Sequence, residues 1–119
     1  MALPNLLNAT TIYGRTAYAN VTSVTSNVLV NSANSGNSYR IVNIMAASID
    51  TGNTGNINVS VVRTGTTNYL GFGLTIPSRA TLILTGKENP VTLEEGDALQ
   101  MSADANNRIW ATITYEDIK

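Results

Sequence analysis

Apolar and polar residues alternate with a period of two along most of the chain, which is the spacing of a β-strand with one buried face. No long window shows the helical period of 3.6 residues. Clusters of Gly, Asn, Asp and Ser separate the alternating stretches and predict turns. The predicted strands cover residues 10–23, 26–31, 39–49, 56–63, 68–76, 80–85, 91–93, 99–103 and 108–118.

This pattern predicts an all-β domain of about eight antiparallel strands, folded as a β-sandwich or a jelly-roll-like barrel over residues 10–119. A length of 119 residues corresponds to one such domain. The segment 91–93 is short and is expected only to be extended. The sequence therefore predicts a single core between two sheets, without a linker or an internal repeat.

The segment 39–49 is apolar on both faces, so we expect it to be a central strand. Strict alternation places one set of its residues on one face: Tyr39, Ile41, Asn43, Met45 and Ala47. The opposite face then carries Arg40, Val42, Ile44, Ala46 and Ser48.

The segment 68–76 contains two glycines on the same face of the predicted strand, Gly71 and Gly73. Two such glycines indicate a bulge or a close approach of another backbone. On the other face, strict alternation points four apolar side chains into the core: Leu70, Phe72, Leu74 and Ile76.

Residues 1–9 do not alternate and contain a proline, so we interpret them as an extended N-terminal arm. The apolar residues of this arm are unusual for a free tail, and they either pack on their own domain or dock onto another chain: Leu3, Pro4, Leu6 and Leu7. The arm lacks a basic region and a long apolar run, so we expect no secretory signal peptide. No segment is apolar enough for a membrane span.

The charge content narrows the function more than the charge balance does. Charged residues make up 13% of the chain, about half of the usual share. Cysteine and histidine are both absent, which excludes disulfides, thiol nucleophiles, thiolate or imidazole zinc sites and Ser-His-Asp catalysis. A net charge of −1 gives no electrostatic reason to expect a nucleic-acid or membrane partner. We therefore predict a non-enzymatic protein without a cofactor.

Lysine, the usual guard against edge-to-edge pairing of strands, occurs only at Lys87 and Lys119. Two explanations remain open. Short strands and polar turns protect the edges, or neighbouring copies in an assembly occupy them.

Three carboxylates gather at one predicted turn: Glu94, Glu95 and Asp97. A catalytic carboxylate pair needs one member to be desolvated so that the two pKa values separate. A glycine-containing turn is expected to be solvated, so we interpret this cluster as structural.

A second polar loop carries oxygen ligands at Asp50, Asn53 and Asn56. Calcium requires six to eight oxygens, usually from several carboxylates, and this loop has one carboxylate. We therefore predict a turn whose Asn side chains bond to their own backbone, and no metal site.

Arginine and tyrosine recur along the predicted strands, as Arg15, Arg40, Arg63 and Arg79 with Tyr13, Tyr39 and Tyr69 nearby. A surface for single-stranded nucleic acid would need clustered positive charge. Arginine and tyrosine are also enriched in protein interfaces. We select Arg15 and Tyr69, together with the apolar residues of the arm, as candidate interface residues.

Trp110 lies opposite Ile109 and Ala111 in the last predicted strand and can therefore face outward. An exposed tryptophan on a sandwich can stack on a sugar, although tryptophan is more common in cores and interfaces.

The C-terminal third carries Val91–Ala103, with Leu-Glu-Glu-Gly-Asp, and Trp110–Ile118, with Tyr-Glu-Asp-Ile. Together with the opening segment Ile12–Ala17 and the middle segments Tyr39–Asp50 and Val59–Val62, these segments resemble a family of small virion structural proteins of tailed bacteriophages, particularly marine and cyanobacterial phages. The resemblance covers residues 10–118.

The resemblance implies a non-enzymatic β-sandwich of a virus particle, made in the host cytoplasm and bound to other virion proteins. The motif contains no catalytic residues; Gly96 would allow its turn and Leu93 would anchor it. The first hypothesis is a capsid decoration (cement) protein that binds the major capsid protein, as a trimer or another small homo-oligomer. The alternatives are a neck, collar, baseplate or tail-fibre component, a carbohydrate-binding module that uses Trp110 and a tyrosine, and a hydrolase that uses Glu94 or Glu95.

Overall fold

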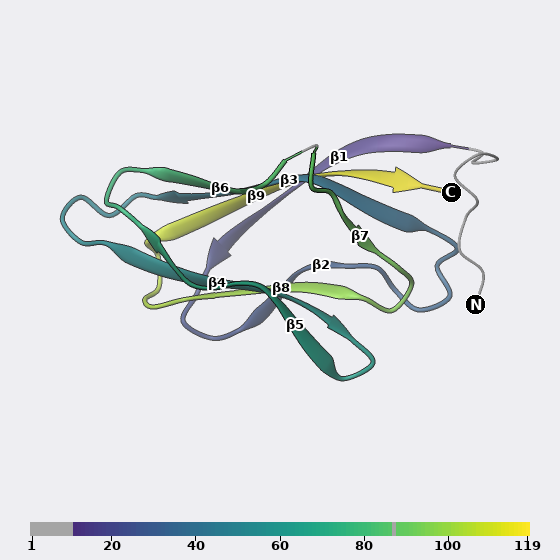
Figure 1. The fold of residues 1–119 in the computed structure, drawn as a ribbon, viewed down its shortest axis with the longest axis horizontal. Helices are drawn as coiled ribbons and strands as arrows, with labels where there is room; N and C mark the ends of the chain where they lie inside the picture. The colour runs from purple at the N-terminus through teal and green to yellow at the C-terminus, as the bar shows by residue number, and fades with distance from the viewer. Residues whose placement is uncertain (1–10, 87) are drawn as a thin grey trace.

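The computed structural model describes residues 11–86 and 88–119, and this part of the chain forms nine β-strands and no helix (Figure 1). The all-β prediction is confirmed. The segment 91–93, expected only to be extended, is also a strand, which brings the number in the described residues to nine. The strands are β1 (Ile12–Val21), β2 (Ser26–Val30), β3 (Ser38–Ser48), β4 (Gly55–Arg63), β5 (Thr66–Ile76), β6 (Thr81–Thr85), β7 (Val91–Leu93), β8 (Ala98–Ala103) and β9 (Ile109–Ile118). The predicted arm over residues 1–9 lies outside the described residues.

The strands form two antiparallel sheets that face each other (Figure 1). Sheet A has the order β1-β9-β3-β6, with β7 also paired to β3, and sheet B has the order β2-β8-β4-β5. The first strand pairs with the last, the second with the eighth, and β4 with β5. This is a doubled ribbon rolled into two layers, so the sandwich has the jelly-roll arrangement.

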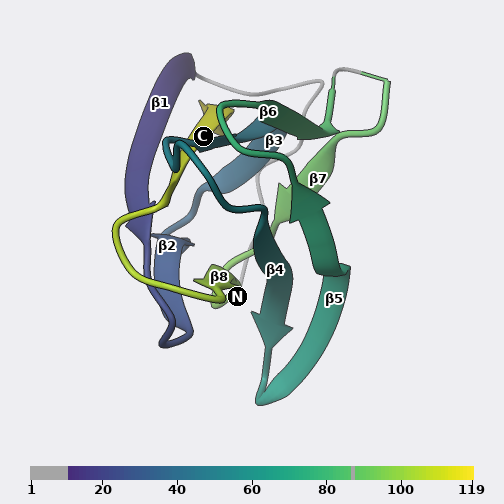
Figure 2. The same cartoon turned by 90° about the vertical axis from the view of Figure 1, so that its left-hand side faces the viewer.

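The edge strands β1 and β2 lie on the same side of the sandwich, and β5 lies on the opposite side (Figure 2). The chain crosses between the sheets at the loops that connect successive strands, such as β3 to β4 and β8 to β9. Sheet A and sheet B therefore each present one outer face to the surroundings.

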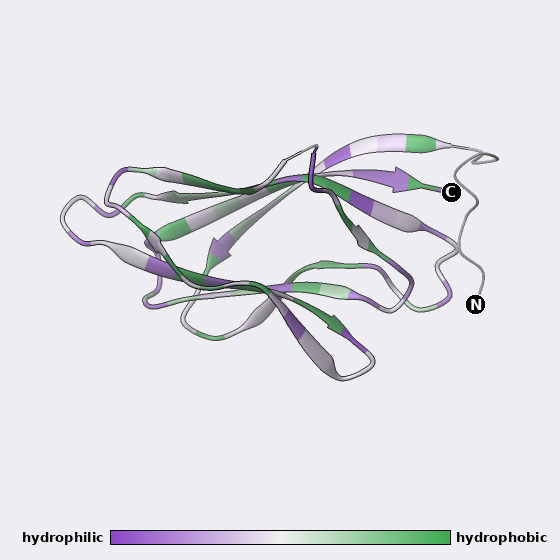
Figure 3. Ribbon diagram, viewed as in Figure 1, coloured by the Kyte–Doolittle hydropathy of each residue, from purple (hydrophilic) through white to green (hydrophobic). Residues whose placement is uncertain are grey.

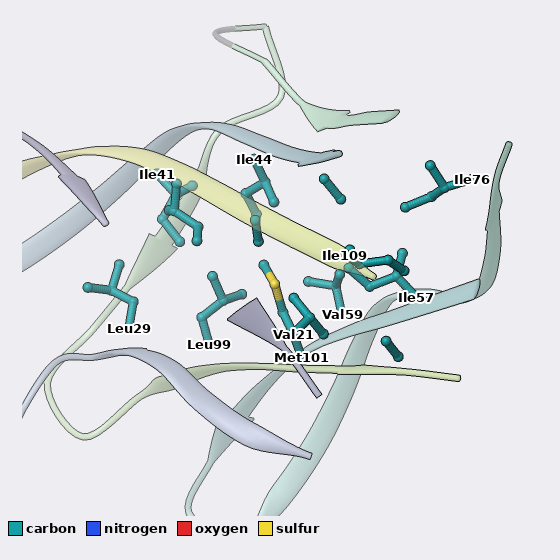
Figure 4. Packing of buried hydrophobic residues seen from close by; sticks show 14 of the residues in the cluster. Val21, Leu29, Ile41, Ile44, Ile57, Val59, Ile76, Leu99, Met101 and Ile109 are labelled. Carbon is teal, nitrogen blue, oxygen red and sulfur yellow. The ribbon is translucent and has the colours of Figure 1, made fainter. Parts of the chain in front are cut away.

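The core lies between the sheets and consists of branched aliphatic side chains, alanines and one methionine (Figure 4). Its fully buried members include Ile41, Ile44, Ile57, Leu99 and Met101. Burial of each such side chain stabilises the fold by roughly 1.5–3 kcal/mol. Hydrophobic and hydrophilic residues alternate along strands of both layers, as expected when each strand has one face toward this core (Figure 3).

Strict alternation along β3 was wrong, because the strand contains a β-bulge. Ile41 lies opposite Tyr115 and Asn43 lies opposite Thr114, which leaves Val42 as an extra residue. A bulge shifts the faces by one position. Ile41 and Ile44 are consequently both buried, although they are three positions apart, a spacing that places two residues of a regular strand on opposite faces.

The prediction that Phe72 belongs to the core was also wrong, for the same physical reason. The β4–β5 pairing shifts register twice, so that β5 gains two residues relative to β4. The bulge predicted from the two glycines is therefore present, and Gly73 adopts a φ of 63° within it. Phe72 leaves the inward row and is 70% exposed.

Candidate functional site

In the acidic turn between β7 and β8, Glu95 and Asp97 are buried while Glu94 is partly exposed, so the prediction of a solvated turn was wrong for two of its three carboxylates. Asp97 is 1% exposed and Glu95 is 6% exposed. Arg63, at the end of β4, donates from Nε to Asp97 Oδ1 at 2.9 Å and from Nη2 to Asp97 Oδ2 at 2.7 Å. The same Nη2 lies 2.7 Å from Glu94 Oε2. A two-point guanidinium–carboxylate pair compensates the burial of the Asp97 charge.

Backbone N–H groups also donate to two of these carboxylates. The N–H of Glu94 donates to Asp97 Oδ2 at 3.0 Å, and the N–H of Gly36 donates to Glu95 Oε2 at 3.2 Å. The hydrogen bond to Asp97, followed by Coulombic attraction to Asp97 and Glu94, raises the pKa of Arg63 above its ordinary value. These carboxylates act as acceptors that fix the turn, which agrees with the structural interpretation of the cluster.

The same turn has the backbone that the motif implies. Gly96 adopts a φ of 88°, a conformation that other residues reach only with strain, and Leu93 is fully buried. Asn31 is also fully buried and bonds across to this turn, through Nδ2 to the carbonyl of Leu93 and through its own carbonyl to the N–H of Gly96. Leu93 and Gly96 thus anchor the turn as expected.

The Asp50 loop is a structural turn, in agreement with the sequence prediction, but the carboxylate makes the bonds. Asp50 Oδ1 accepts the N–H groups of Gly52 at 2.9 Å and Asn53 at 3.1 Å. Asp50 Oδ2 lies 3.0 Å from Arg108 Nε. The backbone hydrogen bonds, first from Gly52 and then from Asn53, hold the pKa of Asp50 below its ordinary value.

Residues 11–86 and 88–119 contain no group of three or more His, Cys, Asp or Glu side chains able to hold a metal ion. In the same residues there is no long apolar helix of the kind that crosses a membrane.

The central part of the outer face of sheet A is a continuous surface without formal charge. Cross-strand registers place its central positions in rows that run from β1 through β9 and β3 to β6. One row is Tyr18, Thr112, Met45 and Ile83, and the next is Asn20, Trp110, Ala47 and Thr81. We call these eight residues the sheet A face.

Large apolar side chains remain exposed on the sheet A face. Tyr18 is 75% exposed, Ile83 is 62% exposed and Trp110 is 45% exposed. Scattered apolar residues are ordinary on a protein surface, whereas these three are gathered on one sheet face. The charged pair Arg40–Glu116 lies farther along the strands, beyond this group.

The outer face of sheet B is different: it is lined with amides and hydroxyls. The registers place Asn27, Gln100, Ser60 and Tyr69 in one row across all four strands. A groove of about 240 Å³ follows this face, and its lining is Thr25, Asn58, Ser60, Thr67, Tyr69, Gln100, Met101 and Ser102. We call this the sheet B groove.

An aromatic pair borders the sheet B groove. The rings of Tyr69 and Phe72 are 5.0 Å apart and meet edge to face. In a regular strand, residues three apart point to opposite faces, so the bulges of β5 are what bring the two rings together. The N–H of Gly73 donates to Asn58 Oδ1 at 2.6 Å, which fixes the bulge to the neighbouring strand.

The structure does not bring the predicted interface residues together. Tyr69 lies on the outer face of sheet B, whereas Arg15 lies on β1 of sheet A. The remaining predicted residues, Leu3, Pro4, Leu6 and Leu7, lie outside the described residues.

Arg15 is engaged within its own domain. Its Nε lies 3.1 Å from Asp117 Oδ2, and its guanidinium carbon lies 5.5 Å from the centre of the Tyr13 ring. Nearby, Tyr115 packs 5.1 Å from the ring of Tyr39. Burial, followed by the influence of Tyr39, raises the pKa of Tyr115 above its ordinary value.

Trp110, whose orientation the sequence left open between core and surface, faces outward and belongs to the sheet A face. Sequence reasoning missed its neighbours Tyr18, Met45 and Ile83, because three other strands supply them. It also missed the amide and hydroxyl row of sheet B. One local signal could have indicated that row: in residues 56–63 and 99–103, polar residues alternate with the apolar residues of the core.

No protein-family model matches the chain, and a search of curated proteins found no significant relative.

Proposed function

We propose that this chain is a non-enzymatic structural protein of a virus particle, acting as a capsid decoration protein of a tailed bacteriophage. The observation that carries the proposal is the sheet A face, where Tyr18, Ile83 and Trp110 are exposed on a surface without formal charge. Burial of apolar surface drives protein association, and such a patch fits a protein partner better than it fits water or an ion.

Two further observations support a place in the virion. Residues 12–17, 91–103 and 110–118 resemble segments of small phage virion proteins. The jelly roll is a frequent fold of viral capsid domains, and this support is an analogy at the level of fold.

The proposed mechanism is passive. A protein that binds the assembled shell and not its separated subunits stabilises the shell by mass action. The sheet A face supplies the main apolar contact, and the arm residues Leu3, Pro4, Leu6 and Leu7 supply a second contact on a neighbouring chain. An arm that becomes ordered on binding loses conformational entropy, so its apolar contacts must exceed that loss. A small homo-oligomer, such as a trimer, would present several faces at once.

A test uses particles assembled without this chain, to which purified protein is added before sedimentation. The double variant Tyr18→Ser with Ile83→Ser is expected to bind particles about thirtyfold more weakly, because exposed aromatic and aliphatic anchors dominate interface energies. Deletion of residues 1–9 is expected to leave a folded sandwich with impaired particle binding.

The matched control is Tyr69→Ser with Phe72→Ser, which removes comparable exposed area from sheet B and is expected to leave particle binding unchanged. Full occupancy by the Tyr18→Ser, Ile83→Ser variant would contradict the sheet A face as the contact. Absence of the chain from purified particles, measured by mass spectrometry, would contradict a virion role altogether.

The alternative within the virion is a neck, collar, baseplate or tail-fibre component. Electron cryo-microscopy of the particles separates the two positions, because a decoration protein follows the shell lattice in many copies and a neck or tail protein occupies one axis in few copies.

A further inference from the structure

We propose that the sheet B groove binds a neutral carbohydrate, independently of any contact made by the sheet A face. The lining of the groove determines the class of ligand. It offers side-chain amides from Asn58 and Gln100 and hydroxyls from Ser60 and Ser102, and it contains no Asp, Glu, Lys or Arg. A ligand rich in hydroxyl groups can pair with such donors and acceptors, whereas a charged ligand would lose its hydration without a partner charge.

The amides of the groove are already held in position. Asn58 Nδ2 donates to Ser102 Oγ at 3.2 Å, while Asn58 Oδ1 accepts the N–H of Gly73. Gln100 Nε2 donates to Asn27 Oδ1 at 2.9 Å. Side chains fixed in this way lose little conformational freedom when a ligand binds.

Hydrogen-bonding capacity remains after these internal bonds. Gln100 Oε1 can accept, and the Ser102 hydroxyl, which accepts from Asn58, can still donate. Ser60 adds a hydroxyl between Gln100 and Tyr69 in the same cross-strand row. The row thus offers donors and acceptors at the interstrand spacing of about 4.8 Å, so that neighbouring side chains can bond to different, non-adjacent hydroxyls of a sugar.

The aromatic pair supplies the apolar half of the recognition. Tyr69 and Phe72 are both more than half exposed. Their rings meet edge to face, so the two ring planes point in different directions. One side of a pyranose ring presents C–H groups, which pack on aromatic faces, while its hydroxyls point outward to polar groups. An aromatic surface beside a few placed polar groups is the common composition of small-ligand sites.

Other ligand classes fit the groove less well. Nucleic acid requires positive charge along the bound backbone, and the groove has none. A protein partner would favour the apolar sheet A face on the other side of the sandwich. The groove of about 240 Å³ is smaller than typical sites that enclose a drug-sized ligand, so it would hold one or two sugar units of a longer glycan.

The test is a titration of ¹⁵N-labelled full-length protein, followed by NMR, with maltohexaose, cellohexaose, mannohexaose and N-acetylchitohexaose. Polysialic acid and a heparin hexasaccharide serve as charged comparisons. At least one neutral hexasaccharide is expected to produce saturable shifts of the Ser60, Tyr69 and Gln100 amides, with a dissociation constant on the order of millimolar or tighter.

Tyr69→Ser is expected to weaken that binding about tenfold, since aromatic contacts contribute on the order of this factor. Tyr18→Ser is the matched control, because it makes the same change at an exposed tyrosine on the opposite face, and it is expected to leave the affinity unchanged. Tyr69→Phe retains the ring and is expected to lose less than Tyr69→Ser.

Three outcomes would overturn the glycan site: no saturable shift with any neutral hexasaccharide at 20 mM, binding of the charged glycans alone, or equal loss of affinity in Tyr18→Ser and Tyr69→Ser. Because the virion proposal is tested on particles with sheet A variants, either proposal can fail while the other stands.

Discussion

The two outer faces of this sandwich are both free of formal charge along their central rows, yet they differ in chemistry. The sheet A face presents Tyr18, Met45, Ile83 and Trp110 among threonines, whereas the sheet B groove presents amides and hydroxyls beside an aromatic pair. One face is suited to exclude water against another protein, and the other is suited to exchange hydrogen bonds with a polar ligand.

The difference also extends to the backbone. The rows of the sheet A face follow regular pairing between β1 and β9, while the aromatic border of the sheet B groove depends on two register shifts in β5. A low content of charge therefore does not specify one kind of surface. Regular strands give extended rows, and bulges collect side chains that alternation would separate.

The largest expected effect tests whether the ion pairs of Arg63, which join the two sheets, stabilise the whole domain. Arg63 belongs to sheet B, and its partners Glu94 and Asp97 follow β7 of sheet A. Asp97→Ala is expected to lower the free energy of unfolding by about 2–3 kcal/mol, because it removes the buried acceptor of Arg63 and of the Glu94 N–H. Urea denaturation followed by circular dichroism measures the change.

The control for this change is Glu88→Ala, at an exposed acidic residue of the preceding turn, which is expected to alter stability by less than about 0.5 kcal/mol. Equal losses in the two variants would show that the Arg63–Asp97 pair does not stabilise the junction.

A smaller effect is expected from a change that affects sheet B alone. Gly73 has a φ of 63°, and a β-branched residue there would cost about 1–2 kcal/mol of stability. Gly73→Val is expected to lower the thermal unfolding midpoint and to shift amide resonances of β4 and β5, while the sheet A face is unchanged. Gly14→Val on β1 is the control, since a Cβ added there meets no atom within 4 Å and the strand favours β-branching. A comparable loss at Gly14 would contradict the strain argument.

The smallest expected effect concerns the Asp50 loop, which joins β3 of sheet A to β4 of sheet B. The pKa of Asp50 is lowered in the folded protein, so its ionised form stabilises the fold. That contribution is present above the ordinary value of 3.8 and is lost as the pH falls through the lowered folded-state pKa. Asp50→Asn is therefore expected to be less stable than the wild type at neutral pH and to approach it in acid.

Thermal unfolding of Asp50→Asn and of the wild type, measured from neutral to acidic pH, gives the difference in stability. Glu88→Gln is the matched control, since it makes the same kind of change at an exposed carboxylate. A difference between Asp50→Asn and the wild type that stays constant with pH would rule out the ionised carboxylate as its source.

Alternation alone predicted the strands, because the period of two follows directly from the pleat. It misassigned Phe72 and half of β3, because it counts residues along one strand and a bulge adds a residue relative to the partner strand. The glycines of β5 signalled that bulge, but they did not indicate which side chains it would turn outward.

The candidate surfaces were less predictable, because their residues come from different strands. Tyr18, Met45, Ile83 and Trp110 are neighbours only through the order β1-β9-β3-β6, and no local pattern encodes that order. Asp97 became buried through an arginine 34 positions earlier in the chain. Both results depend on long-range pairing, which a reading of successive residues does not contain.

The pairing of β1 with β9 has a consequence for biosynthesis. The backbones of Thr11 and Lys119 bond to each other at the two ends of the described chain, so the first strand has no partner in its own sheet until the last strand has been made. Contacts that span so much sequence slow folding, and unpaired edges expose nascent chains to aggregation. Almost the whole domain must therefore emerge from the ribosome before sheet A can form. A chaperone that assists folding would act on a chain in which β1 is not yet paired with β9.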